Sequence, residues 1–295
     1  MTPLSEPFAL EFFQRAAVGG ALVAVLCGVV GTWVVVRGMA FLGEALAHGM
    51  LPGVAVATLA GVPVLLGAAA SAAVMSIALG VLQRRGRLSY DTSIGLLFVG
   101  MLALGVIVIS HSGSFATDAT AILFGDILAV SGSDVVLLAV ATAVGLALAA
   151  LAHRPLVALA LDARVAAVLG LRPALAQALL VGLVTLAVVV SYQAVGSLLV
   201  VGLLVAPAVA ASQWTVRIPT TMALAAALGV VAVQVGLLVS WYAATAAGSS
   251  IAMTAIGLAV ASWAVRSATR AAGTALRTPG PANTTAPAPP VLVPR

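Results

Sequence analysis

The sequence predicts an all-α polytopic membrane protein with about nine transmembrane helices. Its 295 residues are 63% hydrophobic and only 7% charged, whereas roughly a quarter of the residues in a soluble domain are charged. The mean hydropathy is +1.23. Apolar runs of about 20 residues, the length that crosses a bilayer as a helix, follow one another along most of the chain.

These apolar runs define the expected spans in chain order. They cover residues 16–36, 41–60, 62–83, 92–110, 135–152, 174–192, 194–213, 221–241 and 249–267. Glycine and proline separate several of them, as in the turn Leu59–Pro63, which suits a reversal at the membrane surface. The alternative is an eight-span arrangement with the N-terminus inside, in which one early span is dropped or placed elsewhere.

The placement of arginine predicts the orientation in the membrane. All 13 basic residues are arginines. With the N-terminus outside and the C-terminus in the cytoplasm, every arginine except Arg15 falls on the cytoplasmic side, as the positive-inside rule expects. Five of the eight acidic residues then fall outside. The bias towards Arg, Ala, Val and Gly suggests a GC-rich bacterial genome, so we expect a multi-pass protein of a bacterial cytoplasmic membrane.

The spans divide the chain into three parts. Residues 1–15 form an extracytoplasmic N-terminal segment, which lacks the basic start of a secretory signal peptide. Residues 16–268 form the transmembrane domain, with an outer loop at 111–134 and an inner loop at 153–173. Residues 269–295 are rich in Pro, Ala and Thr, so we expect a disordered cytoplasmic tail.

Composition and motifs exclude several classes of function. The net charge of +5 is explained by arginines beside membrane spans, so nucleic acid is not an expected partner. Cys27 is the single cysteine and lies in an apolar run, where it forms neither an intrachain disulfide nor a thiolate cluster. The sequence contains no Walker A or HExxH motif and no nucleophile–base pattern. We therefore expect a transport subunit that is not itself an enzyme and binds no permanent cofactor.

The second expected span contains the strongest candidate site. Glu44 and His48 are four residues apart and share one face of a helix. A carboxylate and an imidazole together can bind Zn²⁺, Mn²⁺ or Fe²⁺, and ionisable residues inside a span are costly unless they function. Pro52 and Gly53 predict a break in the same helix, and broken helices often hold transporter substrates. The alternative is a structural Glu–His hydrogen bond between helices.

Other polar residues give weaker signals. Asp118 and Asp126 in the outer loop would form an acidic mouth that attracts cations, or else are ordinary loop and capping residues. Gln177 and Gln234 are single polar residues within spans, and we expect them to hydrogen-bond to neighbouring helices.

The inner loop contains a second candidate surface. Residues 161–170 read as a short helix of small and apolar residues, with Asp162 as its N-cap, Ala163 and Ala166 within it and Gly170 as its C-cap. Such a helix would dock in a groove of another protein, or alternatively lie on the bilayer surface.

Several of these segments resemble the ABC-3 family of metal permeases. The stretch RGMAFLGEALAHGMLPGVAVA, from Arg37, resembles the family signature of an Arg, an acid, a His and Leu-Pro-Gly. Further segments resemble the family in the same order: residues 91–95, LFGDIL at 123–128, the helix at 162–170, and the glycine- and leucine-rich stretch 195–208. The family's usual acid is Asp, so Glu44 departs from it by one methylene.

The resemblance implies the membrane-spanning permease of an ATP-driven importer for Zn, Mn or Fe ions, similar to type II ABC importers. By that resemblance, Glu44 and His48 line the metal pathway and the helix at 162–170 couples to ATPase subunits. A second permease subunit and an extracytoplasmic metal-binding protein are the other implied partners. The alternatives are a permease for a metal chelate such as a siderophore or cobalamin, and an ATP-independent cation carrier.

Overall fold

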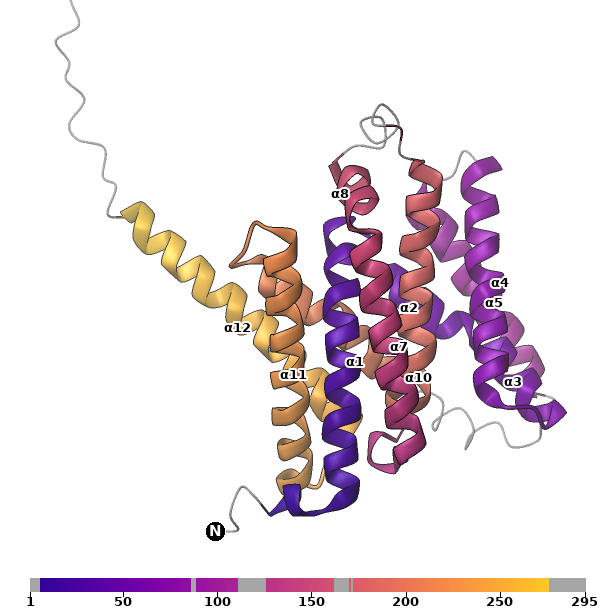
Figure 1. The fold of residues 1–295 in the computed structure, drawn as a ribbon, viewed down its shortest axis with the longest axis horizontal. Helices are drawn as coiled ribbons and strands as arrows, with labels where there is room; N and C mark the ends of the chain where they lie inside the picture. Colours follow the sequence, from indigo (N-terminus) through magenta and orange to yellow (C-terminus); the bar gives the residue numbers. More distant parts are fainter. Residues whose placement is uncertain (1–5, 86–88, 111–125, 162–169, 171, 276–295) are drawn as a thin grey trace, which may run out of the picture.

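The computed structural model describes residues 6–85, 89–110, 126–161, 170 and 172–275. Within these ranges the regular structure is entirely helical (Figure 1). The α-helices are α1 (Glu11–Val36), α2 (Phe41–Gly49), α3 (Leu51–Ala60), α4 (Val64–Arg85), α5 (Tyr90–Ser110), α7 (Gly132–Leu151), α8 (His153–Leu161), α10 (Pro173–Ser212), α11 (Ile218–Ala243) and α12 (Ala247–Ala275). Two short 3-10 helices, η1 (Pro7–Ala9) and η2 (Ile127–Ala129), accompany them.

The lengths and composition of these helices suit a membrane. Among the described residues, eight helical segments are long and apolar enough to cross a bilayer, with α2 and α3 together counting as one. The first begins at Glu11 instead of residue 16, and the last continues to Ala275, past the expected boundary at 268. The fold is therefore the predicted all-α polytopic membrane class.

Arginines mark one end of the bundle. Arg37 follows α1, Arg172 precedes α10 and Arg217 precedes α11. The three meet at one end because α10 and α11 both start beside the end of α1: Arg37 bonds to Gln177 early in α10, and α11 runs antiparallel to α1. We call this the arginine end; it lies at the top of Figure 1.

Helix α1 lies at the centre of the packing, against α10 and α11, because small residues let the helices approach closely. At Gly28, an added Cβ would lie 2.6 Å from the backbone nitrogen of Ala226 in α11. At Gly31, it would overlap the carbonyl oxygen of Leu204 in α10. Gln234 of α11 also donates a hydrogen bond of 3.2 Å to the Ala17 carbonyl, which confirms the interhelical role expected for this glutamine. Such contacts are typical of helices packed in lipid.

Helix α10 is broken at Gly196, and this corrects the predicted span 194–213. The backbone there has φ +73° and ψ 169°, a conformation that only glycine adopts without strain. The sequence predicts two full spans on either side of a turn. The structure instead joins them, with Pro173–Tyr192 long enough to cross and the shorter helix Leu199–Ser212 after the break. By length and composition, the described residues thus hold eight candidate spans. This is one fewer than nine, but the span that is lost is 194–213 and not the early span that the expected eight-span alternative drops.

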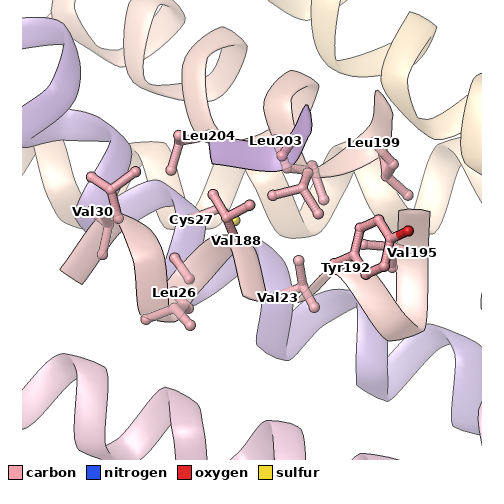
Figure 2. Close-up of a cluster of buried hydrophobic side chains, with 14 of the residues drawn as sticks. Val23, Leu26, Cys27, Val30, Val188, Tyr192, Val195, Leu199, Leu203 and Leu204 are labelled. Atoms are coloured by element: carbon pink, nitrogen blue, oxygen red, sulfur yellow. The ribbon is translucent and has the colours of Figure 1, made fainter. Parts of the chain in front are cut away.

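The chain reverses at this break deep inside the bundle. Ser191 lies beside Cys27, whereas Leu204 lies beside Gly31, only one helical turn further along α1. An unbroken helix would advance about 20 Å between residues 191 and 204. Cys27 is itself about 24 Å along α1 from Glu11, so the reversal lies inside the bundle and not at the end where α1 begins. Figure 2 shows side chains from both sides of Gly196, such as Val188 and Leu203, in one cluster with Val30 of α1.

Helix α8 is an addition to what the sequence predicts. The sequence predicts that an inner loop starts at residue 153. In the structure α8 starts there, directly after α7. Pro155 is tolerated because it lies in the first turn, where backbone N–H groups have no helical acceptor.

Candidate metal site and its surroundings

Glu44 and His48 lie together on α2. The Oε1 atom of Glu44 is 2.8 Å from Nε2 of His48, so the two side chains hydrogen-bond along one face of the helix. The His48 side chain is 18% exposed and that of Glu44 is 36% exposed. The i, i+4 spacing therefore brings the two predicted ligands together without any other element.

Aromatic packing holds the site from behind. The ring of Phe98 in α5 meets the imidazole of His48 edge-on, with centroids 5.5 Å apart, and meets Phe41 at 5.4 Å. Leu42 and Leu46, on the buried side of α2, are almost fully covered. These contacts turn the polar face of α2 away from the bundle core.

Glu44 projects into an apolar groove. The groove has a volume of about 750 Å³ and lies between α2, the second half of α10 and α12. Val201 and Val205 of α10 and Val260 of α12 contribute to its walls, and Glu44 is the single ionisable residue among the described residues that line it. A carboxylate in an apolar groove at membrane depth is costly unless it is covered, paired or bound to a cation.

The interruption that the sequence places at Pro52 and Gly53 separates α2 from α3 at Met50. The backbone of Met50 stays in the right-handed helical region, with φ −79° and ψ −20°. Hydrogen bonds from Met50 N to Leu46 O (3.2 Å) and from Val54 N to Met50 O (3.0 Å) bridge the junction. Pro52 lies in the first turn of α3. The interruption is thus local and does not reverse the chain.

Gly53 has a packing role in the structure. A Cβ on Gly53 would overlap the carbonyl oxygen of Gly67 in α4, and a Cβ on Gly67 would overlap the Gly53 carbonyl. One turn earlier, the hydroxyl of Ser71 in α4 donates a 2.8 Å hydrogen bond to the carbonyl of Gly49. The span that carries Glu44 and His48 is therefore pressed directly against α4.

The remaining predicted residues fall in different places. Asp126 caps η2 by accepting a hydrogen bond from the Leu128 amide at 3.1 Å, which is the ordinary capping role. Gly170 is exposed with φ +72°, a left-handed conformation that suits a helix C-cap. Four further residues lie outside the described residues: Asp118, Asp162, Ala163 and Ala166.

Two residues close to the site, Phe98 and Ser71, are identified by the tertiary structure and not by the sequence. Neither Phe98 nor Ser71 stands out in an apolar sequence, because the sequence does not say which spans pack together. The glycine pair Gly49 and Gly53 does carry a signal: small residues four apart are typical of close helix contacts in membranes. Among the described residues no three His, Cys, Asp or Glu side chains come together, and Glu44 and His48 form a candidate pair.

The fold and site together define a class of protein, a polytopic permease with an acid–imidazole pair on a central span. The chain belongs to the ABC 3 transport family, whose model matches residues 9–266.

Similar proteins agree with this assignment. The manganese transport system membrane protein MntC of Halalkalibacterium halodurans is 35% identical over 230 residues, covering 78% of this chain and 79% of that protein. The chelated iron transport system membrane protein YfeD of Yersinia pestis is 31% identical over 247 residues, covering 83% and 82%. The structure of PsaBC from Streptococcus pneumoniae in complex with Fab has 30% identity and a TM-score of 0.78, covering 88% of this chain and 95% of the other.

Proposed function

We propose that this chain is the membrane-spanning permease subunit of an ATP-driven importer for a divalent transition metal ion, with manganese or iron as the cargo. The family match and the metal-transport relatives support the class of function. The observation that carries the metal assignment is the hydrogen-bonded pair Glu44 and His48, of which Glu44 lines the groove.

The geometry of the pair suits a metal ion in transit. An ion about 2.1 Å from each of two ligands at a right angle needs them about 3 Å apart. The Glu44 and His48 atoms are 2.8 Å apart, so an ion replaces their hydrogen bond with little movement of either side chain. Carboxylate oxygen and imidazole nitrogen accept Mn²⁺, Fe²⁺ and Zn²⁺ alike, so this pair does not by itself select among them.

Two ligands bind an ion only loosely, which suits transport more than storage. We propose that a second permease subunit covers the groove around Glu44 and that the ion crosses between the subunits. The apolar walls support this arrangement, because burial against a partner would remove both the walls and the carboxylate from lipid.

We propose that the arginine end faces the cytoplasm. The positive-inside rule supports this placement for Arg37, Arg172 and Arg217. ATPase subunits would bind at this end, at residues 162–170, and an extracytoplasmic metal-binding protein would deliver the ion at the opposite end. ATP hydrolysis thus belongs to a separate subunit.

Metal uptake tests the proposal. Cells that lack their own manganese importers receive this chain together with its ATPase and binding protein. We expect Glu44→Ala and His48→Ala each to lower ⁵⁴Mn uptake by at least about 100-fold, because each removes one of two ligands. Glu11→Ala removes an exposed acid that pairs with Arg15, far from α2, and serves as the control. Normal uptake of Mn and Fe in both site variants would refute the metal pathway.

A further inference from the structure

Arg37 connects three elements at the arginine end. It ends α1 and is only half-exposed. Its Nη1 donates a 2.7 Å hydrogen bond to the carbonyl of Leu159 in α8, and its Nη2 donates one of 3.3 Å to Oε1 of Gln177 in α10. These contacts reach 122 and 140 residues along the chain. One guanidinium therefore joins α1, α8 and α10.

The same cluster reaches the start of α2. The Gln177 amide nitrogen lies 3.6 Å from the sulfur of Met39, which is buried in the short connection between Arg37 and α2. The amide of Met39 bonds back to the Val34 carbonyl at 2.9 Å, and Gly38 beside it has φ +66°. The connection is thus tightly folded, so a shift of Arg37 or Gln177 moves the first turn of α2, and Glu44 is within that turn.

Helix α8 is attached to the end of α1 at two points. Its first residue, His153, meets the ring of Trp33 edge-on at 5.6 Å. Near its last turn, the Leu159 carbonyl accepts from Arg37, one helical turn beyond Trp33. A movement of α8 at the arginine end is therefore transmitted to α1 through these two residues.

Of these two contacts, the one made by Arg37 is directional. The two acceptors of Arg37 described above, the Leu159 carbonyl and the Gln177 side-chain amide, are neutral oxygens, so position and angle decide the strength of each bond. A guanidinium can serve two acceptors at a fixed angle, whereas the ammonium of lysine is a single point charge on a flexible stem.

We propose that Arg37 is the positioning residue that couples the ATPase-facing end of the permease to the metal site. When the nucleotide-driven movement shifts α8, Arg37 carries that shift to the connection before α2 and so reorients Glu44 and His48. Arg37 does not touch the metal. The inference rests on the proposed function, since it assumes that the ATPase binds at the arginine end and that the ion passes Glu44.

The test measures transport and ATP hydrolysis together. The permease and its ATPase are co-purified, reconstituted in vesicles and supplied with Mn²⁺. In Arg37→Gln we expect Mn²⁺ transported per ATP hydrolysed to fall about tenfold, within the usual range of coupling between sites. We expect Mn²⁺ bound per transporter, measured by electron paramagnetic resonance, to stay at the wild-type level. Arg37→Lys should lie in between. Arg217→Gln, which removes an exposed arginine at the same end but before α11 in the chain, should match the wild type.

A structural role for Arg37 gives a different result. If Arg37→Gln lowers transport and ATP hydrolysis equally, or changes neither, then Mn²⁺ transported per ATP hydrolysed stays the same and the proposal is overturned. If Arg37→Gln does not assemble, Gln177→Leu removes one acceptor and should lower the ratio in the same direction; an unchanged ratio there also overturns it. A failure of the proposed function is distinct, because it appears as full uptake in Glu44→Ala whatever Arg37 does.

Discussion

Two spans in the described part of the chain are interrupted, and they differ in how the chain is interrupted and in what each one carries. The α2–α3 span keeps helical backbone angles at Met50 and holds the ionisable pair Glu44 and His48. Helix α10 reverses at Gly196, and the described side chains around the reversal are predominantly apolar. The polar chemistry therefore lies on the mildly interrupted span, whereas the strongly broken one supplies apolar walls of the groove that Glu44 enters.

The difference has a physical reason. A carboxylate–imidazole pair at i, i+4 needs an intact helical turn to keep its oxygen and nitrogen atoms 2.8 Å apart, so α2 stays regular around it. A reversal inside the membrane leaves backbone groups without helical partners, and these are tolerated only where protein surrounds them. The burial of Tyr192, Val195 and Leu199 on both sides of Gly196 meets that condition.

The largest expected effect concerns how the α2–α3 span is held. Gly53→Val places a branched side chain where a Cβ alone overlaps the Gly67 carbonyl and lies 2.6 Å from the Ser71 Cβ. We expect about 3 kcal/mol or more of destabilisation, because backbone cannot yield as a flexible side chain does. Thermal unfolding in detergent measures it. Gly100→Val is the matched control, since a Cβ there meets nothing within 4 Å; equal stability of the two variants would show that α3 and α4 are not in close contact.

The next effect concerns the reversal in α10. Gly196→Ala must adopt φ +73° and ψ 169°, and we expect it to lose about 2 kcal/mol of stability. Gly182→Ala, in the regular part of α10 with open space around it, should be neutral or slightly stabilising. Chemical denaturation of both variants compares them. If Gly196→Ala is as stable as Gly182→Ala, the chain does not reverse at residue 196.

A smaller effect is expected when Glu44 is replaced by Asp, the acid that is usual at this position in the family. Glu44→Asp shortens the side chain by one methylene, so its carboxylate no longer reaches His48 at 2.8 Å from the same backbone. We expect ⁵⁴Mn uptake to fall about tenfold, which corresponds to roughly 1.4 kcal/mol. Unchanged uptake would mean that each ligand binds the ion independently of the hydrogen bond between them.

The smallest effect concerns Pro52. Because Pro52 lies in the first turn of α3, its missing N–H costs little. Pro52→Ala should therefore change the free energy of unfolding by about 1 kcal/mol or less, compared with about 3 kcal/mol for proline in a helix interior. A gain near the larger value, measured by the same unfolding assay, would show that Pro52 strains the span.

Much of the fold follows from the order of apolar and polar residues along the sequence. The apolar runs predict the membrane class and most spans to within a few residues, because each span must satisfy its own backbone in lipid. Helix α5, observed at Tyr90–Ser110, illustrates this agreement with the expected 92–110. The pair Glu44 and His48 is also a local feature, since the spacing alone brings the two side chains together.

The sequence-based prediction is wrong where hydrophobicity does not reveal the direction in which the chain runs. Residues 194–213 are as apolar as any span, so the sequence predicts a full crossing; the reversal at Gly196 depends on the walls that surround it. Helix α8 is a similar case. The sequence predicts a loop from residue 153, whereas the contacts of α8 with Trp33 and Arg37 support a helix there.

Composition and spacing are enough to identify a helical membrane protein with an acid–imidazole pair on its second span. These features depend on the apolar runs and on positions within one helix, and neither requires knowledge of a neighbouring element. Three other features depend on how distant segments pack: Glu44 faces an apolar groove, Phe98 supports His48, and Arg37 joins α8 to the connection before α2. Such contacts join residues up to 140 positions apart. Most helices here have similarly apolar surfaces, so hydrophobicity does not identify their partners, and the pairs that form are those whose small residues allow close packing.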